Sequence, residues 1–144
     1  IALNTGIAVG AIAVVIPEKT ITTDEIVERI EKSRASGTQH YIIVVSEAIG
    51  NSEALAKEIQ ERTGIESRAT ILGHVQRGGS PTLRDRVAAS RMGAYAVDLL
   101  EKGIGNRVVG MNRDEVIDVD IQEALSMKKP FPIDLYELSN KISF

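Results

Sequence analysis

A glycine-rich turn carries the side chains of this sequence that are best suited to holding a ligand. The turn runs from Gly73 to Pro81, with the sequence GHVQRGGSP, and it contains His74 and Arg77. Glycines let the backbone approach a bound group closely, and an arginine can grip a phosphate through two parallel hydrogen bonds. A helix with Ser80 as its N-cap and Pro81 as its first residue would add unpaired N–H groups. We therefore predict a phosphate ester as the ligand. The alternative is a surface helix entry with solvated cations.

Two charged residues outside the turn could complete such a site. Glu47 follows the apolar run Tyr41–Val45, at the carboxyl edge where open α/β sheets bind ligands. A carboxylate there can accept hydrogen bonds from sugar hydroxyls, although an acid placed before a helix capped at Asn51 is an equally simple interpretation. Arg68 opens a further predicted strand that leads into the turn. It could reach a phosphate, or it could be a surface cation.

The elements that must position these residues alternate between strand and helix. Apolar runs predict buried strands over residues 11–16, 41–45 and 68–72. Between them, one helix is predicted from an N-cap at Thr23 to Gly37, and another from Asn51 or Ser52 to Gly64. The order βαβαβ predicts an α/β fold, with a mostly parallel sheet and flanking helices.

The longest predicted helix follows the turn, from Ser80 to near Gly103, and one stripe of it is expected to face a core: Ala88, Met92, Tyr95, Ala96 and Leu99. The charged residues of this helix are interpreted as salt-bridged surface: Arg84, Asp85, Arg86 and Arg91. Two short strands, 107–111 and 116–119, are predicted around a turn at 112–114, and Asp120 can cap a short helix. Pro130 and Pro132 precede a last helix with three apolar residues on one face: Leu135, Leu138 and Ile142.

Composition excludes several classes of function. The 144 residues carry a formal net charge of −3, which disfavours nonspecific nucleic-acid binding, and contain no cysteine, which excludes disulfides and zinc–thiolate sites. No apolar run approaches the length of a membrane span, and the start has no basic leader, so we expect a cytoplasmic protein. His40 has no partner at metal-ligand spacing. No catalytic triad or carboxylate pair is recognisable, and we expect neither a catalytic residue nor a metal ligand in this chain.

The run from Leu72 to Pro81, LGHVQRGGSP, is followed by Asp85, Arg86 and the stretch ASRMGA from Ala89 to Ala94. Together these closely resemble the bacterial ATP-dependent 6-phosphofructokinases, and the resemblance extends over the whole chain. It implies roughly the C-terminal half of a homotetrameric kinase that converts fructose 6-phosphate to fructose 1,6-bisphosphate with ATP and Mg²⁺. The nucleotide loop, magnesium site and catalytic aspartate would lie in the other half. A noncatalytic sugar-phosphate-binding module and a pyrophosphate-dependent enzyme are the alternatives.

The resemblance also implies roles for individual residues. The carboxylate of Glu47 would bind the sugar, and His74 and Arg77 would bind the 6-phosphate. The intervening residues Val75 and Gln76 would belong to the same substrate site. Arg68 would contact a phosphate across a subunit interface. Residues 1–80 would form part of a sugar-phosphate domain, residues 81–129 would return to the nucleotide domain, and residues 130–144 would be the C-terminal helix of the sugar-phosphate domain.

One region departs from the family pattern. Bacterial relatives bind a nucleoside diphosphate or phosphoenolpyruvate as an effector, through an acidic residue shortly after Gly10 and a basic cluster just before His40. In this sequence the corresponding residues are uncharged: Ile12, Ser36, Thr38 and Gln39. Isoleucine cannot coordinate a cation, and neutral side chains do not offset phosphate charge. The effector pocket is therefore predicted to be degenerate.

Overall fold

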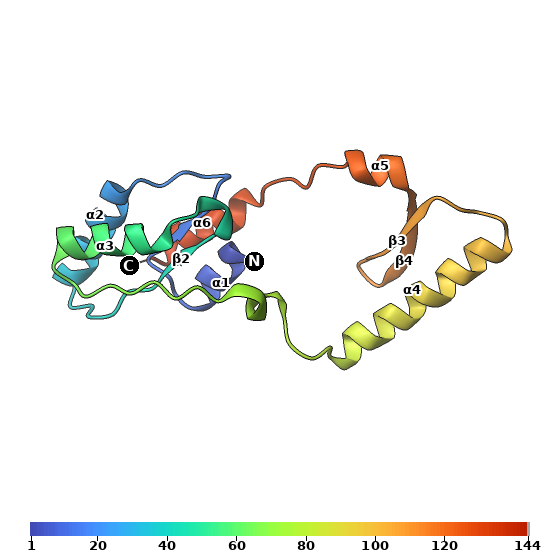
Figure 1. Ribbon diagram of the computed structural model, residues 1–144, viewed down its shortest axis with the longest axis horizontal. Helices are drawn as coiled ribbons and strands as arrows, with labels where there is room; N and C mark the ends of the chain where they lie inside the picture. Colours follow the sequence, from blue (N-terminus) through green and yellow to red (C-terminus); the bar gives the residue numbers. More distant parts are fainter. Residues whose placement is uncertain (144) are drawn as a thin grey trace. The chain divides into compact units, whose positions relative to one another are not determined.

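The structure, a computed structural model, describes residues 1–143 and separates them into two compact units. Unit 1 comprises Ile1–Leu72 and the described residues from Phe131 onward, and unit 2 comprises Gly73–Pro130. The α/β class is confirmed, since the described residues form six α-helices, one parallel pair of strands and one antiparallel pair, as labelled in Figure 1. No helix in the described part of the chain is both long and apolar enough to span a membrane.

The elements have the following bounds in chain order: α1 (Ala2–Ala8), β1 (Ala13–Val15), α2 (Thr23–Ala35), β2 (Ile43–Val45), α3 (Ser52–Thr63), α4 (Leu83–Glu101), β3 (Arg107–Asn112), β4 (Glu115–Asp120), α5 (Ile121–Ser126) and α6 (Ile133–Lys141). Two short 3₁₀ helices, η1 (Glu47–Ile49) and η2 (Gly73–Arg77), lie in the connections.

Strands β1 and β2 of unit 1 pair in parallel, with Ala13 opposite Ile43, and α2 makes the connection between them. The backbone pairing continues on both sides of these short strands. The Ile12 N–H donates to the Ile42 carbonyl over 2.9 Å, and the Ser46 N–H donates to the Val15 carbonyl over 2.8 Å. The β1 side chains are all buried because helices cover both faces, as the continuous apolar run predicted.

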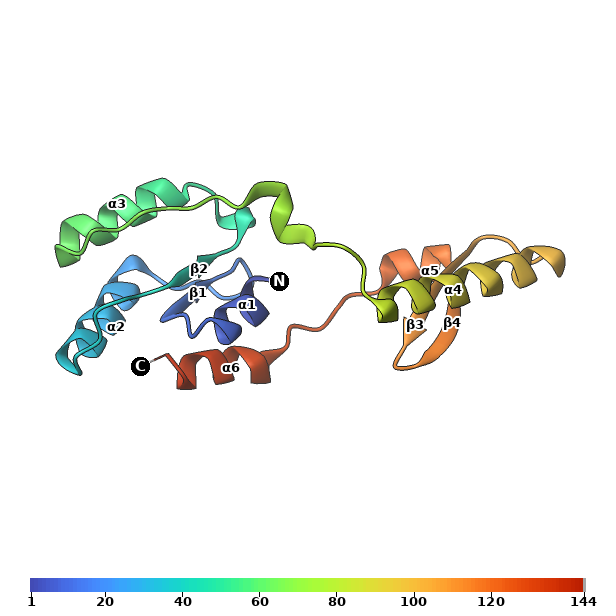
Figure 2. The same ribbon diagram turned by 90° about the horizontal axis from the view of Figure 1, so that it is seen from below.

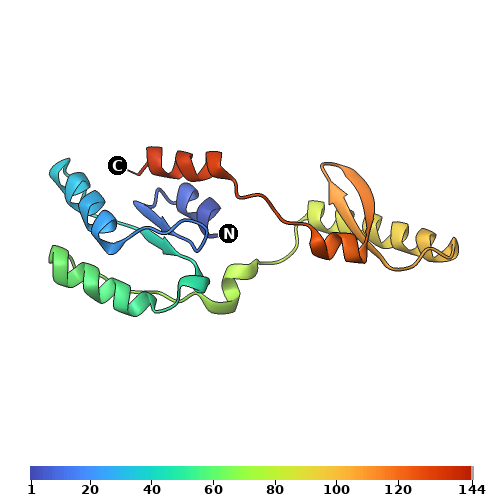
Figure 3. The same cartoon turned by 90° about the horizontal axis from the view of Figure 1, so that it is seen from above.

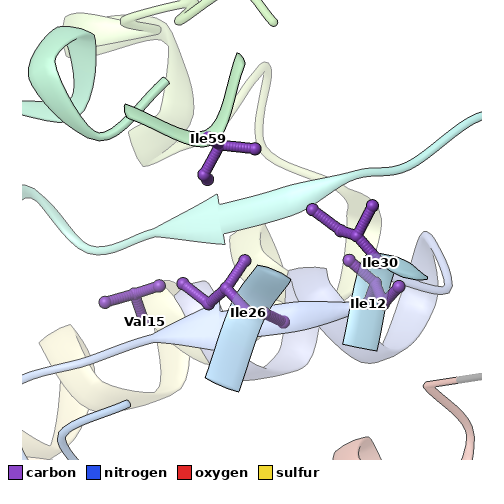
Figure 4. Close-up of a cluster of buried hydrophobic side chains, with 6 residues drawn as sticks. Ile12, Val15, Ile26, Ile30 and Ile59 are labelled. Carbon is purple, nitrogen blue, oxygen red and sulfur yellow. The ribbon is translucent and has the colours of Figure 1, made fainter. Parts of the chain in front are cut away.

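One face of this sheet is covered by α2 and α3. Ile26 and Ile30 of α2 and Ile59 of α3 pack against Ile12 and the β1 residue Val15, and this cluster is drawn in Figure 4. Ile26 and Ile30 are the largest fully buried side chains among the described residues. They lie four residues apart, so both project from the same side of α2.

The opposite face is covered by α1 and α6, as Figure 2 shows. Leu135 and Tyr136 of α6 pack against a buried cluster that includes Val14 of β1. Helix α1, which the sequence patterns did not predict, approaches β1 at Gly6, where an added Cβ would lie 2.2 Å from Val14 Cγ2. A glycine is therefore required at this contact.

The predicted start of α2 needs correction, whereas that of α3 does not. The N-cap of α2 is Thr22 rather than Thr23, because the Thr22 hydroxyl accepts from the Glu25 N–H while the Glu25 carboxylate accepts from the Thr22 N–H. The prediction for α3 is confirmed, with Asn51 as its N-cap and Gly64 as its left-handed C-cap.

The strand predicted over residues 68–72 is wrong. This segment joins no hydrogen-bonded ladder in the described residues, so the βαβαβ order stops after β2 and α3. Isoleucine and leucine in an extended segment satisfy the strand pattern, but a strand also needs a neighbour for its backbone N–H and C=O groups. Ile71 and Leu72 are correspondingly 73% and 59% exposed.

Unit 2 consists of α4 and α5 around the antiparallel hairpin of β3 and β4 (Figure 3). The predicted hairpin and the Asp120 cap of α5 are confirmed. The predicted inner stripe of α4 is also confirmed, since its members are the residues of that helix shielded from solvent: Ala88, Met92, Tyr95, Ala96 and Leu99. The Tyr95 hydroxyl donates to the Asp118 carboxylate over 2.6 Å and ties α4 to the hairpin.

Candidate functional site

The glycine-rich turn folds as the 3₁₀ helix η2, bracketed by glycines with left-handed backbones. Gly73 has φ +59° and Gly78 has φ +146°, values that side-chain-bearing residues rarely adopt. These two residues let the chain enter and leave a single tight coil. The four residues between Gly73 and Gly78, His74, Val75, Gln76 and Arg77, are all exposed.

The 3₁₀ geometry brings the two basic side chains of the turn to one side. A 3₁₀ helix has three residues per turn, so positions i and i+3 are eclipsed, with a rise of about 2 Å per residue. His74 and Arg77 stand in this relation. Neither side chain forms a hydrogen bond or ion pair with any residue from 1 to 143. One anion above this face could accept hydrogen bonds from both.

The helix start that follows the turn differs from the prediction. Helix α4 begins at Leu83 with Thr82 as its N-cap, not at Pro81 with Ser80. The Asp85 carboxylate accepts hydrogen bonds from the Thr82 hydroxyl and from the Thr82 N–H, each over 2.8 Å, and these two bonds lower the pKa of Asp85. An acidic side chain therefore already sits at this helix end. The anion-binding capacity of the region belongs to His74 and Arg77 rather than to the helix dipole.

Glu47 lies in unit 1 and is placed as its position after β2 predicted. It is the first residue of η1, two residues beyond the carboxyl end of the strand, and its side chain is exposed. Gly50, with φ +70°, ends this short coil, and Asn51 then caps α3. In the described part of the chain the Glu47 carboxylate takes part in no salt bridge, which leaves both oxygens free to accept hydrogen bonds from a hydroxylated ligand.

Arg68, also in unit 1, is held by a neighbour that the sequence patterns did not single out. Its Nε and one terminal nitrogen donate to Glu66 Oε1 over 2.9 and 2.5 Å. Both side chains are largely exposed, at 83% and 70%. A surface ion pair contributes about 0–1 kcal/mol, less than a charge-assisted bond to a phosphate, so the pair is a resting arrangement that an anion can displace. Two charges of opposite sign at i and i+2 in an extended segment were the signal for it.

The residues of the predicted degenerate effector pocket lie in unit 1 and do not form one cluster. Thr38 and Gln39 line a shallow hollow of about 340 Å³, together with Arg34, Gly37, Tyr41 and Ile65. Ser36 caps the end of α2, and its hydroxyl donates to the Lys32 carbonyl. Gly10 and His40 are exposed outside the hollow, whereas Ile12 is buried in the core between the sheet and α2.

The only cation among the residues that line this hollow is Arg34, and it is occupied. Its terminal nitrogen Nη1 lies 3.3 Å from Glu31 Oε1 and 3.2 Å from the Thr63 carbonyl oxygen. The Tyr41 hydroxyl likewise donates to the Thr38 carbonyl over 2.6 Å. The polar groups here hold the turn after α2 in place, and they offer a phosphate little uncompensated positive charge.

A metal site is not formed by the described residues, because no three His, Asp or Glu side chains among positions 1–143 come together in a geometry that could ligate an ion. Mg²⁺ requires near-octahedral oxygen coordination, usually through one or two carboxylates and the phosphates of a nucleotide. The residues present do not fit that ion on their own. The chemistry within reach of the described side chains is anion binding by His74 and Arg77 and hydrogen-bond acceptance by Glu47.

Comparison with known proteins identifies the sequences that this chain is similar to. The family model described as Phosphofructokinase matches residues 1–100. The ATP-dependent 6-phosphofructokinase 1 of Clostridium perfringens (strain 13 / Type A) is 50% identical over 143 residues, which cover 99% of this chain and 45% of the relative. The ATP-dependent 6-phosphofructokinase of Clostridium botulinum (strain Loch Maree / Type A3) is 47% identical with the same coverage. That of Clostridium novyi (strain NT) is 46% identical over 144 residues, which are 100% of this chain and 45% of the relative. The chain thus spans a little under half the length of these relatives.

Proposed function

The chain belongs to the phosphofructokinase family, and we propose that it supplies the fructose 6-phosphate site of an ATP-dependent 6-phosphofructokinase. The observation that carries this proposal is η2, which presents His74 and Arg77 on one side of a single coil between two left-handed glycines. A dianionic sugar phosphate matches the charge of Arg77 and the two adjacent hydrogen-bond donors that Arg77 and His74 present. The alternative of a surface helix entry is disfavoured, because the helix itself starts later, at Leu83.

The remaining parts of the site follow from the same chemistry. The Glu47 carboxylate accepts hydrogen bonds from the sugar hydroxyls, and Val75 and Gln76 hold the two basic residues at their spacing. We propose that the assembled enzyme is a homotetramer. In it, Arg68 releases Glu66 and binds a phosphate across a subunit interface. Each charge-assisted hydrogen bond to the phosphate contributes about 1.5–3 kcal/mol.

The division of labour along the chain is also proposed. Residues 1–80 and 130–144 belong to the sugar-phosphate domain of a cytoplasmic enzyme, and residues 81–129 return to the nucleotide domain. The parallel pair β1 and β2 is then part of a larger parallel sheet. The whole is the C-terminal half of the kinase, and ATP, when bound with Mg²⁺ by the other half, supplies the phosphoryl group. The residues of this chain bind the substrate and fix its orientation.

Titration of the 144-residue chain with fructose 6-phosphate, followed by amide chemical shifts, tests the site directly. We expect saturable shifts at residues 73–78, and little response to unphosphorylated fructose. Arg77→Ala should weaken fructose 6-phosphate binding roughly tenfold to a hundredfold, because it removes charge-assisted bonds of about 1.5–3 kcal/mol. Arg113→Ala is the matched control, since Arg113 is an exposed arginine of the same unit in the hairpin turn. Equal affinity of wild type and Arg77→Ala would contradict the proposal.

The 144-residue chain alone should form no fructose 1,6-bisphosphate. Phosphoryl transfer needs a metal-bound donor and a group that handles the proton of the attacking hydroxyl, held in one geometry. A coupled assay with ATP, Mg²⁺ and fructose 6-phosphate measures this. Product formation that is abolished by Arg77→Ala would show that the catalytic groups lie in this chain after all.

A further inference from the structure

The turn that follows Glu47 contains two successive residues with left-handed backbones. Gly50 ends η1 with φ +70°, and Asn51, which carries a side chain, follows with φ +35° and ψ +48°. Glycine adopts a positive φ freely, whereas a residue with a Cβ is strained there, although asparagine tolerates this region better than most. Backbone strain of this kind is concentrated at functional sites, where the surrounding structure maintains it.

The capping role of Asn51 does not by itself require a left-handed backbone. Its Oδ1 accepts a hydrogen bond from the Ala54 N–H over 3.2 Å, as N-cap side chains commonly do. Thr22 and Thr82 form the same kind of bond at the starts of α2 and α4, but their backbones are extended, with φ −82° and −73°. An extended residue at position 51 would change the direction in which the chain enters α3. The left-handed conformation is therefore tied to the path of the chain between β2 and α3.

Both ends of this path are fixed within unit 1. At the first end, the Ser46 N–H donates to the Val15 carbonyl over 2.8 Å and attaches the chain to the sheet. At the other end, α3 is held to the core by the buried Ile59. Between them, the Gly50 N–H donates to the Glu47 carbonyl over 3.1 Å and closes η1. Because neither end is free to move, the conformation of the turn determines where the Glu47 backbone lies.

We propose that Asn51 is a positioning residue, whose left-handed backbone holds Glu47 where its carboxylate accepts hydrogen bonds from the sugar hydroxyls. This inference rests on the proposed function of Glu47. No group in residues 1–143 donates to or pairs with the Glu47 carboxylate, so only the backbone and the rotamers of Glu47 itself determine where the carboxylate lies. The competing interpretation is that Asn51 acts only as a helix cap.

Three substitutions of Asn51 separate its backbone conformation from its cap bond. Glycine keeps the left-handed backbone and loses the side-chain cap, serine keeps a capping hydroxyl but disfavours that backbone, and alanine lacks both properties. We expect Asn51→Ser and Asn51→Ala to weaken fructose 6-phosphate binding by the 144-residue chain about threefold to tenfold, and Asn51→Gly to stay within about twofold of wild type. Amide chemical-shift titrations measure these affinities. Asn106→Ala is the matched control, since Asn106 is an exposed asparagine of unit 2 with φ +60°, and it should leave the affinity unchanged.

Inorganic phosphate is the second probe, because it carries no sugar hydroxyl for Glu47 to bind. Its affinity should be the same in the wild-type chain and in all three Asn51 variants, whereas a general loss of structure would weaken both ligands. In a Glu47→Ala background, Asn51→Ser should cause no further loss of fructose 6-phosphate affinity, since its effect passes through Glu47. Hydrogen exchange of the β1 and β2 amides verifies that unit 1 is folded in each variant.

Three results would overturn this inference while leaving the proposed sugar-phosphate site intact. The first is an affinity that Glu47→Ala lowers but Asn51→Ser and Asn51→Ala leave unchanged. The second is an effect of Asn51→Ser that persists in full in the Glu47→Ala background. The third is an Asn51→Gly variant as weak as Asn51→Ala, which would assign the role to the cap bond. A wild-type chain that does not bind fructose 6-phosphate, or a Glu47→Ala variant with wild-type affinity, would instead contradict the proposed role of Glu47 and this inference with it.

Discussion

Substituting Gly6 by alanine should destabilise unit 1, although alanine is the better helix former. The new Cβ would lie 2.2 Å from Val14 Cγ2, whereas carbon atoms pack at about 3.5–4.0 Å. To restore this spacing, helix α1 would have to move away from the buried Val14 side chain of strand β1 by more than 1 Å. Overpacking of this kind costs about 1–3 kcal/mol, and alanine returns about 1 kcal/mol of helix propensity. We expect a net loss of up to about 2 kcal/mol.

Native-state hydrogen exchange of the amides in β1 and β2 is the appropriate assay, because it reports on unit 1 alone. Gly93→Ala provides the matched control, since its Cβ meets nothing within 4 Å. In the free chain this variant should protect the α4 amides by about 0.5–1 kcal/mol.

A double-mutant cycle with Val14→Ala identifies the cause. Removing Val14 Cγ2 leaves the next neighbours of the new Cβ, Val14 Cβ and Ala11 Cβ, at ordinary contact distances of 3.5 and 3.7 Å. The cost of Gly6→Ala should therefore disappear in the Val14→Ala background, with a coupling energy of about 1–3 kcal/mol. Additive effects of the two substitutions, or a stabilising Gly6→Ala, would refute this account of the contact between α1 and β1.

Three further expectations follow from single residues. Arg113 holds a left-handed backbone with φ +57°, so Arg113→Gly should raise the unfolding free energy of unit 2 by up to about 1 kcal/mol in hydrogen exchange, whereas Arg113→Ala should not. Bonds from Tyr95 and Arg107 lower the pKa of Asp118, so their contribution is present above the ordinary aspartate pKa and is lost as the pH falls through the lowered value. Asp118→Asn should remove that acid dependence of unit 2. In the proposed assembled enzyme, millimolar phosphoenolpyruvate or ADP should shift half-saturation by fructose 6-phosphate less than tenfold, because the residue at the position where the resemblance implies an acid is the buried Ile12. A larger shift would contradict that expectation.

The starts of α2 and α4 are determined by local sequence. The N-caps are Thr22 and Thr82 rather than the predicted Thr23 and Ser80. Each of these two threonines has an acid three residues later, Glu25 or Asp85, that completes a capping box. Three residues after Thr23 and Ser80 stand Ile26 and Leu83, which cannot reciprocate. The sequence therefore did specify which residue is the N-cap, through the acid three positions after it rather than through the cap residue itself.

Elements that depend on distant partners were the ones that local patterns missed or misplaced. Helix α1 contains a glycine and has no side-chain cap, and it is held by packing on β1 and α6. Residues 68–72 have the composition of a strand, but no ladder forms on them among the described residues. Both outcomes depend on contacts far along the chain, which propensity does not describe.

The candidate site was predictable to the extent that it is local. The i, i+3 spacing of His74 and Arg77 can be read in the sequence, and the 3₁₀ coil converts that spacing into a shared face. The pairing of Arg68 with Glu66 was not anticipated, although the opposite charges two residues apart in an extended segment were a signal for it. The phosphate-binding role of the glycine-rich turn and the relation of Glu47 to it stay predictions.

Helix α6 has a consequence for the order in which the protein can fold. It packs on α1 and β1 of unit 1, yet it follows the whole of unit 2 in the sequence. On the ribosome, the side of the sheet that carries Val14 and Ile16 therefore has only α1 to cover it while residues 73–130 are made, for on the order of several seconds at roughly 5–20 residues per second. Closing the longer loop adds little to the equilibrium free energy, because that penalty grows only logarithmically with length. The penalty is kinetic instead, because a nascent chain whose apolar layer is only partly covered is a substrate for chaperones and for aggregation until Leu135 and Tyr136 emerge.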